Sequence, residues 1–146
     1  MGQPDIESAL TSRFSTLGFT YVAYPNGPVE EIPATAMNFA LSILYANADP
    51  AAIGASAADR YDGIFRVAVR VPLSQANANP VGLNAAYTAI NTIMTAYKKG
   101  TSIGYPTAAP TTYVHCQVPK MTHIGSGVDK SWYSIVISIP WWSDIS

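Results

Sequence analysis

The chain has 146 residues, of which eight are basic and nine acidic, so its formal net charge is −1. This balance gives no bulk attraction to nucleic acid or to an anionic membrane, and a single cysteine excludes a disulfide framework and a multi-cysteine metal site. Charged residues make up only 12% of the chain, about half of the usual share. Because 49% of the residues are hydrophobic, this low charge is the feature that needs an explanation.

The first half of the chain predicts one helix and two strands. Apolar side chains recur on one stripe over 5–17 and predict an amphipathic helix; they are Ile6, Leu10, Phe14 and Leu17. The aromatic and β-branched run over 19–24 predicts a short strand, which ends in the Pro-Asn-Gly-Pro turn over 25–28. Over 35–45 large apolar residues alternate with small ones, which predicts a strand on a core, although the alanines also allow a helix.

The segment 46–60 is rich in small residues and carries one proline and one glycine. It is long enough for an extended stretch of ~50 Å or a hairpin of ~25 Å, at about 3.3 Å per residue. Loops of this length are usually functional or disordered. We therefore expect a long loop at about 46–60 whose natural use is docking onto another molecule.

The strongest strand signal covers 61–71. Its inward side chains are apolar and alternate with polar or small ones; the inward set is Phe65, Val67, Val69 and Val71. Arg66 and Arg70 share the outward face because side chains alternate along a strand. A polar loop follows over 74–79.

The remaining chain predicts the clearest helix and two more strands. The helix begins at Pro80, which suits the first helical position, and it ends near Gly100, a residue that favours the left-handed cap. Strands are expected over 112–119 and 132–140, joined by the glycine-rich turn over 124–127.

These elements predict an α+β fold with a mainly antiparallel four- to five-stranded sheet and two helices packed on one face. We expect a single domain over 1–146. No window approaches 18 consecutive apolar residues, so no transmembrane helix and no membrane partner are expected. The first residues have neither the basic start nor the apolar core of a signal peptide. Assembly, which buries apolar and neutral surface between subunits, remains as the explanation of the low charge.

Residues with catalytic or metal-binding chemistry are few and badly placed. His115 and Cys116 are neighbours on a predicted strand, so their side chains point to opposite faces and do not readily share a metal ion. His123 follows with no acidic residue between. The thiol also lacks a base, because His115 faces away from it. The sequence predicts no catalytic residue, no metal site and no cofactor.

The basic residues are dispersed along the chain. They include Arg66, Arg70, Lys98, Lys99, Lys120 and Lys130. Scattered cations do not form the stripe that nucleic-acid binding uses, so no sequence-specific nucleic-acid partner is expected. A solvated or inter-subunit role is favoured, although a ring would gather such charges around a pore.

Taken together, the pieces resemble the tail terminator proteins of long-tailed bacteriophages, of the lambda minor tail protein U type. The resemblance covers nearly the whole chain. Its most telling motifs are the strand opening Asp62-Gly63-Ile64 and the helix exit Lys99-Gly100-Thr101, with Trp132-Tyr133 at the start of the last strand. Neither of the first two motifs is catalytic.

The resemblance implies a structural virion protein that forms a hexameric ring on the head-proximal end of the tail tube. Such a ring stops tube polymerisation, docks the head connector or a head-completion protein, and lets DNA pass through its lumen. It also implies no enzymatic activity and no cofactor, and assembly in the host cytoplasm. The alternatives are a head-completion, neck or tail-tube subunit, and a small-molecule-binding domain with a pocket lined by Tyr87, Tyr97 and Tyr105.

A ring protein needs residues that contact a neighbouring subunit or ring. The candidates come from the long segment, the outward face of the 61–71 strand, the polar loop and the aromatic pair near the carboxyl end. They are Asp49, Ile53, Asp59, Arg60, Arg66, Arg70, Gln75, Asn77, Trp141 and Trp142.

Overall fold

The computed structural model describes residues 3–25, 37–50, 59–72, 80–106, 109–110, 112–125 and 132–145. The elements in chain order are α1 (Gln3–Ser15), β1 (Val22–Ala23), β2 (Asn38–Pro50), β3 (Asp59–Pro72), α3 (Pro80–Ala96), β4 (Ser102–Tyr105), β5 (Thr112–Cys116), β6 (Lys120–Gly125) and β7 (Trp132–Ile145). The predicted loop over 74–79 lies outside the described residues, as does most of the turn over 25–28. No helix in the described part of the chain is long and apolar enough to cross a membrane.

The described strands form one mixed sheet. Its order is β1-β2-β3-β7-β5-β4, and β6 also pairs with β7. β1 runs parallel to β2, whereas the other pairs are antiparallel. The prediction of a mainly antiparallel four- to five-stranded sheet is therefore wrong, because the sheet is mixed and has seven strands in the described residues.

The prediction lacks β4 and β6. β4 lies in a stretch that Gly104, Pro106 and Pro110 mark as loop, and it becomes a strand because it pairs with β5. β6 has no alternating pattern of its own and forms by pairing with β7 from Lys120 to Gly125. Long-range pairing, which local sequence does not record, decides both elements.

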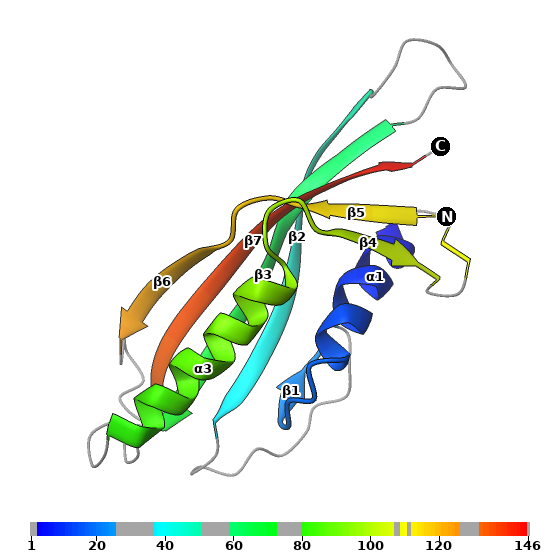
Figure 1. Cartoon of the computed structure of the whole chain (residues 1–146). Helices are drawn as coiled ribbons and strands as arrows, with labels where there is room; N and C mark the ends of the chain where they lie inside the picture. The colour runs from blue at the N-terminus through cyan, green and yellow to red at the C-terminus, as the bar shows by residue number, and fades with distance from the viewer. Residues whose placement is uncertain are drawn as a thin grey trace.

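The core lies between the sheet and the two helices. β3 and β7 form its centre and pair from Asp59 opposite Ile145 to Pro72 opposite Trp132. Alternate residues of both strands are fully buried on one face; they are Phe65, Val67, Val69, Ile135, Ile137 and Ile139. Both helices contribute to the same core cluster, and Figure 1 shows α3 lying along β3 and β7. The buried Tyr97 hydroxyl donates a 2.6 Å hydrogen bond to the Leu10 carbonyl and ties the end of α3 to α1.

The strands β2, β3 and β7 extend beyond the rest of the sheet, as Figure 1 shows. We call this extension the arm; it comprises residues 46–50, 59–61 and 143–145. In it Asp49 lies opposite Arg60, and Arg60 lies opposite Asp144. The described ends of the segment 46–60 are thus strand, so the expected loop does not extend along its whole length. Residues 51–58, at its centre, lie outside the described residues.

Candidate assembly surfaces

A row of stacked side chains crosses the base of the arm. The Arg60 guanidinium lies over the Trp142 ring, 4.3 Å from its centroid, and Trp142 stacks on His115 with centroids 4.1 Å apart. His115 continues the row through a 2.7 Å hydrogen bond between its Nδ1 and the Ser102 hydroxyl. The row joins β3, β7, β5 and β4, so side-chain contacts tie the arm to the neighbouring edge of the sheet.

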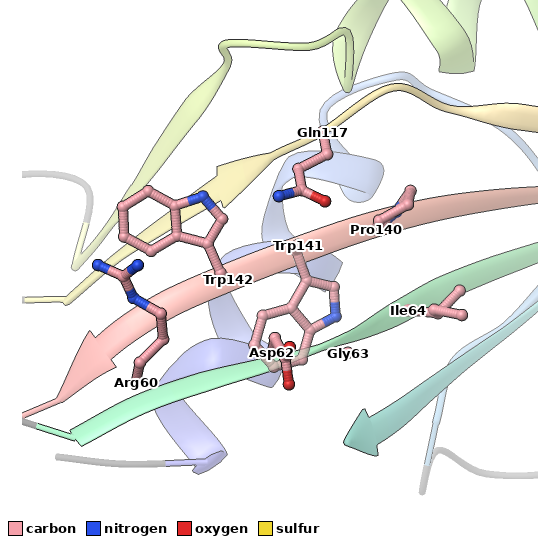
Figure 2. A pocket seen from close by; sticks show the side chains of 8 residues that line it. All are labelled: Arg60, Asp62, Gly63, Ile64, Gln117, Pro140, Trp141 and Trp142. Carbon is pink, nitrogen blue, oxygen red and sulfur yellow. The ribbon is translucent and has the colours of Figure 1, made fainter. Parts of the chain in front are cut away.

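An ion pair orients the first member of this row. Arg60 donates from Nε to Oδ1 of Asp144 at 2.8 Å and from Nη2 to Oδ2 at 3.2 Å. The hydrogen bond holds the pKa of Asp144 below its ordinary value and raises the pKa of Arg60. Both side chains are exposed, so the pair positions Arg60 over Trp142 more than it stabilises the fold. Two members of the row, Arg60 and Trp142, line a surface pocket of about 420 Å³ together with Asp62 and Gln117 (Figure 2).

The two neighbouring tryptophans divide between surface and core. They leave β7 on opposite sides (Figure 2), and Trp141 is only 1% exposed. The Tyr45 ring packs edge-on against Trp141, with centroids 5.6 Å apart. Gly63 lies opposite Trp141, and a Cβ at position 63 would meet Cζ2 of Trp141 at 2.8 Å and collide with the Leu44 carbonyl oxygen. Glycine therefore leaves room for the indole in the motif Asp62-Gly63-Ile64.

The face of the sheet opposite the helices is not covered by them, and we call it the open face. Arg66 and Arg70 share this face and lie opposite Ser138 and Ser134 of β7. Both arginines are exposed. Most neighbouring positions in register carry short or apolar side chains; they are Ala40, Ser42, Leu44, Ile64, Ala68, Thr122, Val136 and Pro140. Asn38, opposite Arg70 on β2, is polar and buried.

The exposed side of α3 carries no charge. The sequence of Pro80–Ala96 contains no acidic or basic residue, and its exposed described side chains are Ala85, Tyr87, Thr88, Asn91, Thr92 and Thr95. A surface helix normally places charged residues toward solvent. Covering hydroxyl and amide groups costs less than covering charges, so α3 presents the surface best suited to burial by another molecule.

Five of the predicted interface residues are either outside the described residues or described only by their backbone pairing. Ile53, Gln75 and Asn77 lie outside the described residues. Asp49 and Asp59 belong to the paired backbone of the arm, opposite Arg60 and Pro50. An interface role for the ten candidates stays a prediction.

The sequence-based candidates omit the exposed side of α3, and they also omit charged and aromatic residues of the other two surfaces. Asp144 and His115 join the row at the base of the arm, and Lys120 lies on the open face opposite Ser138. Alternation along β7 places Asp144 on the same side as Trp142, which is the one local signal available. The positions of His115 and Lys120 follow only from the pairing of β5 and β6 with β7.

The described residues show little that could serve chemistry. No group of three His, Cys, Asp or Glu residues among them lies close enough to hold a metal ion. Cys116 is buried, which raises the pKa of its thiol to about 11, so it stays protonated and unreactive at neutral pH. Tyr97, expected to line a small-molecule pocket, is instead a core side chain bonded to the Leu10 backbone.

Comparison with known proteins bears on all of these surfaces. A family model described as phage tail terminator protein matches residues 5–141. No curated protein and no solved structure is detectably similar to the chain. The match extends from α1 to Trp141 and covers both helices and the open face, and the family is structural and not enzymatic. The chain belongs to the phage tail terminator protein family.

Proposed function

We propose that copies of this chain form a hexameric ring on the head-proximal end of the tail tube, as in the lambda minor tail protein U type. The ring stops tube polymerisation and provides the surface to which the head connector or a head-completion protein docks. The observation that carries the proposal is the family match over residues 5–141. The subunit folds in the host cytoplasm and ends as a component of the virion tail.

The edges of the sheet support a ring. In the described residues β1 pairs with β2 only at Phe39 and Ala40, and β6 pairs only on its β7 side. In the described residues the sheet thus has two open edges on opposite sides, and open edges are templates for pairing with another chain. A contact between two different surfaces of the same chain is heterologous and closes into a ring when its rotation allows. The β6 edge of one copy against the β2 edge of the next is such a contact.

The arm and α3 support contacts along the tail axis. The arm extends beyond the rest of the sheet with the Arg60–Trp142 row across its base, and the uncharged side of α3 offers a second, chemically different surface. A terminator must match the last ring of the tube on one side without repeating that matching surface on the other side. Two unlike surfaces on one subunit meet this requirement.

Electron microscopy and light scattering of the purified chain test the proposal. Single rings with the mass of six subunits are expected, and adding them to polymerising tube protein should shorten the tubes. Open-ended tubes of the chain alone would favour the tail-tube alternative, whereas a monomeric mass across micromolar concentrations would contradict a ring. Binding to heads but not to tube ends would favour a head-completion subunit.

A further inference from the structure

Three cationic side chains gather on the open face although they are far apart in the sequence. Arg66 and Lys120 both lie opposite Ser138, on either side of β7, so their backbones are about 10 Å apart at a strand spacing of about 4.8 Å. Arg70 follows Arg66 four residues along β3, about 13 Å away at 3.3 Å per residue. All three side chains are exposed. The positions form a triangle of positive charge on one side of the sheet.

No described acidic side chain neutralises this triangle. In the described residues, an ion pair joins Arg60 to Asp144 at the arm. The nearest described carboxylate on the same face is Asp62, four residues from Arg66 along β3 in the direction of the arm, again about 13 Å away. In the part of the chain that the structure describes, the triangle is therefore a local excess of positive charge.

The side chains between the three cations are short. They include Ser42, Ala68, Thr122, Ser134 and Ser138. Short side chains let a long partner lie close to the sheet, with the arginine and lysine heads reaching out to it. The aromatic row lies at the other end of the face, around Trp142, so the triangle itself has no stacking platform of the kind that single-stranded bases use.

We propose that the open face contacts the phosphate backbone of duplex DNA through Arg66, Arg70 and Lys120, without reading its sequence. Phosphates supply the continuous negative charge that matches cations spaced by about 10 and 13 Å. In the described residues a second copy of this chain is a poorer match, because the exposed carboxylates there, Asp62 and Asp144, lie beside Arg60. This inference rests on the proposed ring only for its setting, in which the open faces line the lumen.

Binding of a fluorescent 30-bp duplex of arbitrary sequence, followed by anisotropy at 50–200 mM salt, tests the proposal. The variant R66S/R70S/K120S removes the triangle. The matched control R13S/K98S/K99S removes the same charge from α1 and from the end of α3. Each phosphate contact contributes a slope of about 0.9 in the logarithm of affinity against that of salt. Loss of three contacts should therefore flatten the slope by about 2.7 for each subunit that contacts the duplex, while the control keeps the wild-type slope.

The same samples separate this inference from the proposed ring. Light scattering gives the assembly mass, and thermal melting shows that each variant folds. Rings that bind no duplex at 50 mM salt would overturn the DNA contact and leave the ring intact. An equal loss of binding in both variants would also overturn it, since only net charge would then matter. A triangle variant that binds the duplex normally would show that the open face does not contact DNA. A triangle variant that folds but fails to assemble would place the open face between copies of the chain.

Discussion

Replacing Gly63 with alanine tests the packing at the base of the arm. A Cβ at this position would lie 2.8 Å from Cζ2 of Trp141 and would collide with the Leu44 carbonyl oxygen. The first neighbour belongs to a buried ring and the second to the backbone of β2, so neither moves without cost. Overpacking of this kind typically costs about 1–3 kcal/mol, and we expect the upper end because a backbone contact is involved. At about 2–4 °C per kcal/mol, the melting temperature should fall by about 6–12 °C.

A double-mutant cycle with Trp141→Phe isolates the ring contact. Phenylalanine removes the crowded atom and also the indole Nε1, which has no hydrogen-bond partner among the described residues. We therefore expect Gly63→Ala to cost at least ~1 kcal/mol less in the phenylalanine background, a coupling typical of residues in contact. Ala68→Ser, on the same strand but facing the open side, should change stability by less than about 0.5 kcal/mol. Denaturant melts that show Gly63→Ala to be as stable as wild type, or that show no coupling with Trp141→Phe, would refute this account of the packing.

Four further expectations concern the surfaces and the titrating groups. Deleting residues 51–58 should leave the melting temperature close to wild type but impair tail joining, and wild-type infectivity of a phage with this deletion would exclude a docking role. Thr92→Lys puts a charge on the uncharged side of α3. It should lower binding to tube ends in pull-downs without changing thermal stability, and unchanged binding would show that α3 does not contact the tube. Burial raises the pKa of the Cys116 thiol to about 11, so its contribution to stability is complete below the ordinary thiol pKa of about 8.5 and is lost as the pH rises toward 11. At pH 8 a thiol reagent should label Cys116 only after denaturation. Fast labelling of the folded chain would contradict its burial. The hydrogen bond from Arg60 lowers the pKa of Asp144, so its contribution to stability is present above the ordinary value of about 3.9 and is lost as the pH falls below that value. Asp144→Asn should therefore weaken the loss of stability at acid pH. An unchanged loss would show that the ion pair has no effect on stability.

The sequence predicts well those elements whose pattern is local. The stripes of apolar residues in α1 and α3, and the alternation in β3 and β7, each predict an element that the structure contains. Segments whose structure depends on a distant partner are predicted poorly. β4 contains a glycine and has prolines close by, and β6 lacks alternation, so both acquire strand structure from β5 and β7. The arm strands likewise carry small residues with no strand signal over 46–50 and depend on the ladder with β3.

The candidate surfaces show the same division. Alternation alone places Arg66 and Arg70 on one face, and the structure agrees. Lys120 joins them only because β6 is in register with β7, so a list of basic residues along the sequence looks dispersed. The stacking of Trp142 on His115 also needs the β5–β7 pairing. Charge clusters that span several strands therefore cannot be predicted from the sequence until the strand order is known.

The low charge of the chain is unevenly distributed over its surface. α3 carries no charged residue, the open face carries three exposed cations, and the base of the arm pairs its arginine with a carboxylate. Each surface suits a different partner, because uncharged surface is covered at low cost whereas unpaired cations need a charged counterpart. A subunit that ends a polymer needs such unlike surfaces, since a chain with one repeated matching surface would continue to grow. The scarcity of charge in the sequence is thus better understood as a separation of uncharged and charged surfaces, each placed for its own contact.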